Sequence, residues 1–335
     1  MESANKQQLI PYQDLLQLII KAFVKQGITE QAALSVAQHL VQAEIDGQSG
    51  HGLSRIPTYM TQISSGKVNP KAKVKLSQDK PSFLCVDADC GFAFPAIAEA
   101  IEAGVPLARQ QGALFISITN SHHAGVLGQH IESIAQQGLV ALMMCNAPAA
   151  IAPWGGIKPV FGTNPLAFAC PRVDADPLII DLSLSRIARG KIVRARALGE
   201  QIPLGWALDP QGQPTQDPQA AIDGTMIPIG ESKGAALALM VELLTAGLAG
   251  AHFGFEASSL LDGKGVSPRI AQAIIMISPD DIAAFSAKAE RLFATILEQE
   301  GTRLPGTARF ARRAQAEREG VTVFTSDYDL LCAML

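Results

Sequence analysis

The residues best suited to acid–base chemistry begin with a histidine in a glycine-rich turn. His51 lies in the segment DGQSGHGLSR, with Gly50 and Gly52 on either side. Glycine lets the backbone turn sharply and leaves the imidazole accessible to a ligand. Arg55 follows about one helical turn later, where its guanidinium could hold a substrate carboxylate through two hydrogen bonds. A helix connection with a surface histidine would give the same pattern, so this segment alone does not decide the function.

A second pair of histidines follows an apolar run. His122 and His123 stand in NSHHAG, directly after LFISIT, which has the composition of a strand. Small-residue loops at strand ends are common binding sites. One ring is enough to donate a proton or to orient a carbonyl. A zinc site would need a third ligand that no spacing identifies, so we expect no metal, and a metal-dependent hydrolase stays a less favoured alternative.

Two polar segments farther along the chain could contact a substrate or a ribose. Thr163 lies in GTNP, which together with PWGG frames a short apolar run, and it offers a hydroxyl and backbone donors. Asp181, Ser183 and Ser185 alternate with apolar residues after the run PLII, and Lys191 follows them. The alternating groups could bind ribose hydroxyls and Lys191 a phosphate, although an edge strand with one polar face explains the alternation equally well.

An anion site is predicted at the start of an apolar helix. Ser232 and Lys233 lie in GESKG, just before AALALMVELLTAGLAG. The free amides and the dipole of a helix N-terminus both favour an anion, and the phosphate of a dinucleotide fits there. The GxxxxGK[ST] pattern is absent, as are GxSxG and any GxGxxG that follows a predicted strand. An ordinary Rossmann dehydrogenase is therefore disfavoured.

The elements that must position these residues form an α/β pattern. Apolar residues at helical spacing predict helices over residues 12–26 and 30–46, with Thr29 as N-cap and Gly47 as the stop, and a third helix beginning near Ser54. Further helices are expected at 94–110, 127–137 and 233–250. Strands are expected where short runs are rich in β-branched residues, namely KVKL, SFLCVDA, LFISITN, LVALMMCN, LAFACP and LIIDLSLS.

The C-terminal part is predicted to contain a long amphipathic helix. Ser278 is the expected cap, Pro279 the first helical residue, and the helix should run to about Glu298. A basic loop and helix, RLPGTARFARRAQAER, and the strand GVTVF follow. Three arginines in the basic helix could bind a 2'-phosphate, although a solvated helix face is the commoner role of such a pattern: Arg309, Arg312 and Arg313.

The overall composition is that of a globular protein with a large core. The chain has 335 residues, 48% hydrophobic and 17% charged, and a net charge of -4, so nucleic acid is not an expected partner. The first residues lack the features of a secretion signal and the apolar runs are too short to span a bilayer, so we expect a cytoplasmic protein without a membrane partner. Five cysteines without a CxxC are expected to be reduced core residues: Cys85, Cys90, Cys145, Cys170 and Cys332.

Taken together, these segments and their order resemble the malate/L-lactate dehydrogenase-like oxidoreductases over nearly the whole chain. The stretch GESKGAALALMVELLTAGLAGAHFGFEASSLLDGKG is most similar to the members that reduce cyclic imino acids. The resemblance implies NAD(P)H-dependent reduction of Δ1-pyrroline-2-carboxylate to L-proline and of Δ1-piperideine-2-carboxylate to L-pipecolate. The alternative is a malate- or lactate-type 2-hydroxy-acid dehydrogenase. Either NADPH or NADH could serve, and NADPH is slightly favoured.

The resemblance also implies a fold, an assembly and a set of site residues. The expected fold class is α/β, with a non-Rossmann dinucleotide-binding domain (residues 121–279) built on a largely antiparallel sheet, and a substrate and dimer domain formed by residues 1–120 with 280–335. A homodimer is expected. By position, the implied catalytic residues are His51 and His123, and the implied substrate-binding residues are Arg55 and Thr163. The implied cofactor-binding residues are Asp181, Ser183, Ser185, Ser232, Lys233, Gly306, Thr307 and Ala308.

Two positions depart from the family pattern. Family members often have a serine directly before the first histidine, as part of a proposed relay, whereas this chain has Gly50 there and Ser49 one place earlier. Lys191 stands where some imine reductases have an acidic residue. A Ser-His-Asp relay is therefore not expected in this chain.

Overall fold

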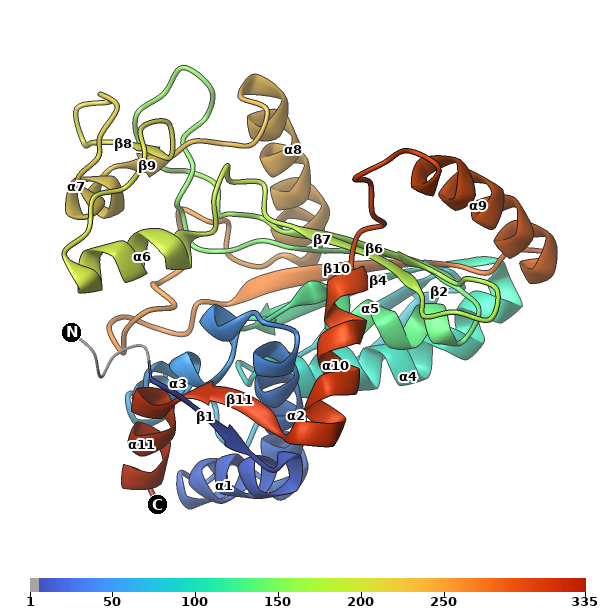
Figure 1. The fold of residues 1–335 in the computed structure, drawn as a ribbon, viewed down its shortest axis with the longest axis horizontal. Coiled ribbons are helices and arrows are strands. Elements are labelled where there is room, and N and C mark those ends of the chain that lie inside the picture. Colours follow the sequence, from blue (N-terminus) through green and yellow to red (C-terminus); the bar gives the residue numbers. More distant parts are fainter. Residues whose placement is uncertain (1–5) are drawn as a thin grey trace.

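A computed structural model describes residues 6–335 of the chain (Figure 1). The N-terminal part is helical, with α1 (Tyr12–Lys25), α2 (Glu30–Ile45) and α3 (Ile56–Ser64) packed around a core that includes the fully buried ring of Phe23. Thr29 caps α2 by accepting from the amide of Ala32, as predicted. The C-terminal strand β11 (Val321–Phe324) pairs with β1 (Gln7–Ile10) beside these helices, so both ends of the described chain complete one unit.

A seven-stranded sheet forms the centre of the molecule, in the order β2-β3-β4-β10-β5-β6-β7. All neighbouring pairs are antiparallel except β3 with β4, which are parallel. The sheet is therefore largely antiparallel and the chain is an α/β protein, which confirms the predicted fold class. The strands are β2 (Lys75–Lys80), β3 (Phe83–Asp87), β4 (Ala113–Ser121), β5 (Val140–Cys145), β6 (Leu166–Cys170), β7 (Leu178–Leu182) and β10 (Ile270–Ile277).

Helices cover both faces of this sheet. On one face, α4 (Ala93–Gln111) and α5 (Leu127–Gln136) bury Ile97 and Ile131 against strand residues such as Ile116 and Ile274. On the other face, α8 (Ser232–Glu242) and a π-helical turn (Leu243–Gly247) pack on the alternate residues of the same strands. The strands therefore lie buried between two apolar layers, with α9 (Ile282–Leu297) packed near the end of the sheet that contains Cys170.

A small lobe lies beside α8. It contains α6 (Arg189–Leu198), α7 (Pro218–Asp223) and the short pair β8 (Ala207–Leu208) and β9 (Thr225–Met226) (Figure 1). The remaining elements are α10 (Thr307–Glu319) and α11 (Thr325–Ala333), which lie with the N-terminal helices. No helix among residues 6–335 has the length and apolar character needed to cross a membrane.

Several sequence-based expectations need correction. Strand β10 was not among the predicted strands, although it is the central strand of the sheet and is almost wholly buried. Helix α9 begins later than predicted, because Asp281 rather than Ser278 is its cap and accepts from the amide of Ala284 at 2.9 Å. The cysteines are all unpaired, but only two of the five are buried, Cys145 and Cys170.

The predicted division of the chain stays a prediction. The sheet takes β2, β3 and β4 from before residue 121 and its other strands from after it, so one continuous layer crosses the predicted boundary. Strands from both predicted parts therefore lie in the same sheet.

Candidate active site

The pairing register aligns the ends of several strands, and we call this line of strand ends the sheet edge. Loops that leave this edge carry His123 after β4, Thr163 before β6 and Ser183 after β7. Each loop therefore starts from a fixed point on a buried scaffold. The residues paired along this edge are Ser121 with Ile270, Cys145 with Gln272, Met144 with Leu166, and Leu166 with Leu182.

The two predicted catalytic histidines lie face to face. The rings of His51 and His123 are nearly parallel, 9° apart in plane and 5.3 Å between centroids. His51 comes from a 3-10 turn (Ser49–His51) after α2, and His123 from the loop after β4. Tyr59 of α3 fixes the second ring, because its hydroxyl lies 2.6 Å from Nδ1 of His123. The structure thus joins residues that are 72 positions apart in the chain.

A buried carboxyl group holds the turn that carries His51 and Arg55. Oε1 of Glu44, in the last turn of α2, accepts a hydrogen bond of 2.6 Å from the amide of Leu53. Gly52 packs directly on the same carboxyl, since a Cβ there would lie 2.1 Å from Oε1. The turn after it (Leu53–Arg55) places Nε of Arg55 2.7 Å from the carbonyl of Gly50, which leaves the terminal guanidinium nitrogens without a partner among residues 6–335.

Burial keeps the site histidines neutral. Desolvation, with the Arg55 charge second, lowers the pKa of His51 to about 3, and the same two causes hold the pKa of His123 well below its ordinary value. Desolvation also raises the pKa of Tyr59, so its hydroxyl stays protonated. A neutral imidazole beside a buried guanidinium is equipped to accept a proton from an alcohol whose carboxylate binds the cation.

His122 has a different environment from its neighbour. Its side chain is buried, and neither ring nitrogen has a hydrogen-bond partner among the described residues. Burial is the main cause that lowers its pKa to about 3, and the charges of Lys67 and Arg55 add to it. Residues 6–335 contain no group of three or more His, Cys, Asp or Glu side chains arranged to hold a metal ion.

Thr163 is positioned by a buried carboxylate that the sequence did not indicate. Glu242 of α8 accepts from Asn164 Nδ2 at 3.0 Å, from Asn146 Nδ2 at 3.1 Å and from the amides of Gly162 and Gly254. Charge-assisted hydrogen bonds of this kind fix three loops around one group. Thr163 lies between two of the residues held in this way, although among residues 6–335 no hydrogen bond joins it directly to the stacked histidines.

The polar strip after β7 reaches the start of α8. The hydroxyls of Ser183 and Ser185 are 2.6 Å apart, and Ser183 Oγ donates to the carbonyl of Thr163 at 3.3 Å. The amide of Ile229 bonds to the carbonyl of Leu184, which brings the segment with Ser232 and Lys233 alongside. Both of these residues are exposed at the N-terminus of α8, as the anion-site prediction requires.

Asp181 meets the turn at the start of α10. Its Oδ2 accepts from the amide of Gly128 at 2.8 Å, and burial raises the pKa of the carboxyl while that bond and the Arg309 charge lower it. Gly306 packs on the carbonyl of Ile179, because a Cβ there would lie 2.8 Å from that oxygen. The predicted cofactor residues Gly306, Thr307 and Ala308 therefore lie beside Asp181.

The arginines of α10 have mostly structural partners. Arg313 bonds to both oxygens of Asp46 and of Glu132, and Nη1 of Arg312 donates to the carbonyl of Asp46 at 2.8 Å. All three side-chain nitrogens of Arg313 are therefore engaged, whereas the exposed Arg312 uses only Nη1 and keeps its other donors for a 2'-phosphate. Arg309 differs, because it is 7% exposed and its Nη1 is a buried donor without a partner among residues 6–335.

The predicted residues thus form three groups. One joins Thr163, Ser183 and Ser185 to the segment at the start of α8. His51, Arg55 and His123 cluster with Tyr59 at one end of the sheet edge, whereas Asp181 and the α10 turn cluster on the face covered by α5. Sequence reasoning missed Tyr59, Glu44 and Glu242. In the sequence, Tyr59 and Glu44 look like ordinary core or surface residues of a helix. Their partners, His123 and the amide of Leu53, become apparent only in the folded structure.

Comparisons with known proteins show which proteins this chain is similar to. The sequence pattern of the malate/L-lactate dehydrogenase family matches residues 10–331. A protein of Chromohalobacter salexigens named (2R)-3-sulfolactate dehydrogenase (NADP(+)) is 50% identical over 299 residues, which are 89% of this chain and 90% of that protein. A Δ1-pyrroline-2-carboxylate/Δ1-piperideine-2-carboxylate reductase of Pseudomonas syringae pv. tomato is 37% identical over 97% of this chain and 95% of its own length.

Solved structures show the same relationship. The crystal structure of Δ1-piperideine-2-carboxylate reductase from P. syringae superposes with a TM-score of 0.92 at 37% identity, covering 98% of this chain and all of that one. A sulfolactate dehydrogenase from Methanocaldococcus jannaschii gives a TM-score of 0.88 at 28% identity, covering 98% and 96% of the two chains.

Proposed function

Because this chain belongs to the malate/L-lactate dehydrogenase family, we propose that it is a nicotinamide-dependent 2-hydroxy-acid dehydrogenase whose substrates resemble (2R)-3-sulfolactate. The observation that carries the chemistry is the stacking of neutral His51 on His123 beside the unpartnered end of Arg55. The choice of a hydroxy acid is supported by the 50% identity to a protein of that name, against 37% for the imine reductases.

Arg55 binds the substrate carboxylate in this proposal. Its Nε is held by the Gly50 carbonyl, so the guanidinium presents its two remaining nitrogens in a fixed orientation. A planar guanidinium matches the two oxygens of a carboxylate, and the interaction is strong because the site is largely removed from water. Thr163 helps to orient the same end of the substrate from the loop before β6.

His51 moves the proton. In oxidation its neutral imidazole takes the proton of the 2-hydroxyl group, and in reduction the imidazolium returns it to the keto oxygen. Burial is the main cause that lowers the pKa of His51, and the Arg55 charge is the second; an anion bound at Arg55 offsets this second cause and raises the pKa of the ring when the substrate is present. His123, oriented by Tyr59, holds the stacked ring in place and contacts the reacting group.

The chain's residues fit a dinucleotide. A buried carboxylate in Asp181, the close backbone approach at Gly128 and Gly306, and an unpartnered buried guanidinium nitrogen of Arg309 together form a polar cradle. When bound, a nicotinamide cofactor supplies or accepts the hydride at the substrate's C2. Ser232 and Lys233, exposed at the start of α8, would hold a phosphate.

NADPH is the proposed form of the cofactor. The support is the NADP(+) in the name of the 50% identical relative, together with the unpartnered nitrogen of Arg309. The homodimer and the cytoplasmic location expected from the resemblance stay predictions, and sedimentation equilibrium of the purified protein tests the first.

Reduction of cyclic imino acids is the second candidate. It is favoured by relatives with that name at 37% and 38% identity and by the TM-score of 0.92 to the structure of one such reductase. Gly50 and Lys191, which depart from the family relay, do not count against it, because a partly protonated imine depends less on an enzyme acid than a ketone does.

A parallel assay separates the two candidates. NADPH and NADH oxidation would be followed with 3-sulfopyruvate, oxaloacetate, pyruvate, Δ1-pyrroline-2-carboxylate and Δ1-piperideine-2-carboxylate. We expect the highest kcat/KM with 3-sulfopyruvate and NADPH. A preference for the two cyclic imines over every keto acid would transfer the assignment to the second candidate.

A further inference from the structure

Helix α6 carries a cluster of positively charged side chains. It contains Arg189, Lys191, Arg194 and Arg196 and no acidic residue. The guanidinium of Arg194 lies 5.5 Å from the ring centroid of Phe324, at the end of β11. Because α11 follows β11 and packs against the turn Leu53–Arg55, α6 lies near the unit that presents Arg55.

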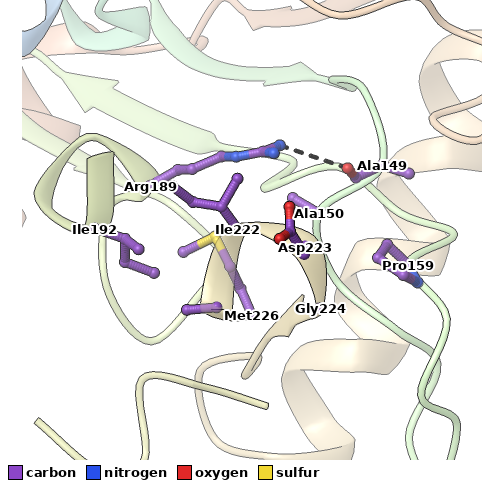
Figure 2. Close-up of a pocket in the computed structure, with 10 residues that line it drawn as sticks. Ala149, Ala150, Pro159, Arg189, Ile192, Ile222, Asp223, Gly224 and Met226 are labelled. Atoms are coloured by element: carbon purple, nitrogen blue, oxygen red, sulfur yellow. Dashed lines mark hydrogen bonds between the residues drawn. The ribbon is translucent and has the colours of Figure 1, made fainter. Parts of the chain in front are cut away.

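Arg189 reaches into a cavity of about 110 Å³. Figure 2 shows its guanidinium extended across the cavity toward the carbonyl of Ala149. Apolar side chains form much of the wall, among them Ile192, Ile222 and Met226. One water needs on the order of 10–15 Å³ by this measure, so the space admits a group of several heavy atoms.

The charge of Arg189 has no counter-ion among residues 6–335. Its one hydrogen bond is to the carbonyl of Ala149, at the long distance of 3.5 Å, and no carboxylate among residues 6–335 lies within 4.0 Å of it. Arg172, by contrast, bonds to both oxygens of Glu290 at 2.9 Å. Burial lowers the pKa of Arg189, and a desolvated cation without a partner is unfavourable, so this group is arranged to receive an anion.

The cavity is tied to the segment that carries Thr163. On one side, Ser183 Oγ bonds to the carbonyl of Thr163 and to Ser185 Oγ, which in turn donates to the carbonyl of Ile187, two residues before Arg189. On the other side, the cavity wall at residues 149–150 continues into Ile151, which pairs with residue 161 just before Thr163. Both walls of the cavity are therefore connected by hydrogen bonds to the loop that carries Thr163.

We propose that Arg189 binds a second anionic group of the substrate, the sulfonate or carboxylate on C3, while Arg55 binds the C1 carboxylate. This inference rests on the proposed function and specifies its substrate class as 2-hydroxy acids with an anion at C3. The planar guanidinium suits an oxyanion with at least two oxygens, and the apolar wall favours a compact group. Asp223 also lines the cavity, but it is exposed and engaged by Gln219 Nε2 at 2.9 and 3.0 Å.

The test compares substrates with and without the second anion. Arg189→Gln is expected to raise KM for 3-sulfopyruvate and oxaloacetate about 10- to 100-fold, the usual loss for a hydrogen-bonded charge, and to leave KM for pyruvate within about 2-fold. Arg196→Gln is the matched control, because Arg196 is an exposed arginine on the same helix and bonds to Gln219. It should leave all three values unchanged. Unfolding temperatures of both variants establish that they are folded.

A binding measurement separates this inference from the assignment of activity. Calorimetric titration with 3-sulfolactate and with lactate, in the presence of NADP(+), should show tighter binding of the dianion to the wild type, and Arg189→Gln should abolish that preference whatever the enzyme reduces. Three results would each overturn the role of Arg189. The first is an equal loss of activity on pyruvate and on the dianions, and the second is no loss on any substrate. The third is a wild type that binds lactate as tightly as 3-sulfolactate. Turnover of imines alone, with the dianion preference still dependent on Arg189, would overturn only the proposed function.

Discussion

Oε1 of Glu44 accepts a hydrogen bond of 2.6 Å from the backbone amide of Leu53. This contact joins the end of α2 to the turn that carries His51, the proposed proton-transfer residue, and Arg55, the proposed carboxylate anchor. Because the carboxyl is 8% exposed and lies against the backbone of Gly52, the turn has little freedom to take another conformation. The orientation of both proposed substrate contacts therefore depends on one acid that touches no substrate.

Gly52→Ala is expected to disturb this turn. The new Cβ would lie 2.1 Å from Glu44 Oε1 and 2.5 Å from its Cδ, so the turn must move. We expect kcat/KM to fall about 100-fold, as small displacements of positioning groups do. Gly50→Ala is the matched control, because a Cβ there meets nothing within 4 Å and should leave kcat/KM nearly unchanged. Equal behaviour of the two variants would contradict the account of the turn.

Glu44→Gln is expected to change how stability depends on pH. Burial, opposed by the Leu53 bond and assisted by Asp327, raises the pKa of Glu44 from 4.5 to about 7. A raised pKa means that the folded state holds its proton while the unfolded state loses it, so the wild type loses stability as pH rises from 4.5 to 7. The glutamine cannot ionise. Its free energy of unfolding relative to the wild type should therefore increase over this range, by on the order of 3 kcal/mol, in urea titrations at pH 4.5, 6 and 8. A constant difference would show that Glu44 has the same pKa in the folded and unfolded states.

His51→Ala is expected to affect ketones more than imines. Reduction of a keto acid needs a proton at the oxygen, and loss of a general acid costs ~10²–10⁴-fold. A cyclic imine with a pKa near neutral arrives partly protonated and depends less on the enzyme for that proton. The ratio of kcat/KM for 3-sulfopyruvate to that for Δ1-pyrroline-2-carboxylate should fall in the variant. Losses of the same size on both substrates would remove His51 from proton transfer.

Stability is also expected to fall in acid because of a buried histidine pair. The rings of His39 in α2 and His130 in α5 stack 4.4 Å apart, and burial lowers the pKa of both. Their contribution to stability is complete above the unfolded-state pKa of 6.5 and is lost as pH falls from there toward the lower folded-state values. Unfolding in urea at pH 7.5, 6.5 and 5.5 measures this slope. His130→Gln, which removes one titrating ring, should reduce it, and an unchanged slope would contradict the assignment.

Local sequence patterns predicted most helices and strands correctly. They did not predict most contacts between residues that are far apart in the chain. The helices at 12–25 and 30–45 follow from apolar spacing and from the cap at Thr29, which are properties of neighbouring residues. Strand β10 was missed because its stability comes from antiparallel pairing with β4 and β5, segments more than 120 residues away. A fully buried strand also lacks the alternation that identifies a half-exposed one.

The same reasoning explains which parts of the site were found. His51, Arg55 and His123 were recognised from their local segments and the order of those segments. The bond from Tyr59 to His123 and the role of Glu242 depend on how the loops meet at the sheet edge, which no local pattern records. Arg189 was passed over because its segment could be an edge strand, whereas the structure ends β7 at Leu182 and begins α6 at residue 189.

Arg313 links the proposed nucleotide-binding residues to the proposed catalytic residues. It stands six residues after Thr307 on the helix that begins at the dinucleotide cradle, and it grips Asp46, five residues before His51, together with Glu132 of α5. A shift of that helix on uptake of the nucleotide would carry the catalytic imidazole with it. The affinities for the acid substrate and for the nucleotide would then change each other by the same factor, as linkage requires, and the ion pairs of Arg313 would transmit this coupling.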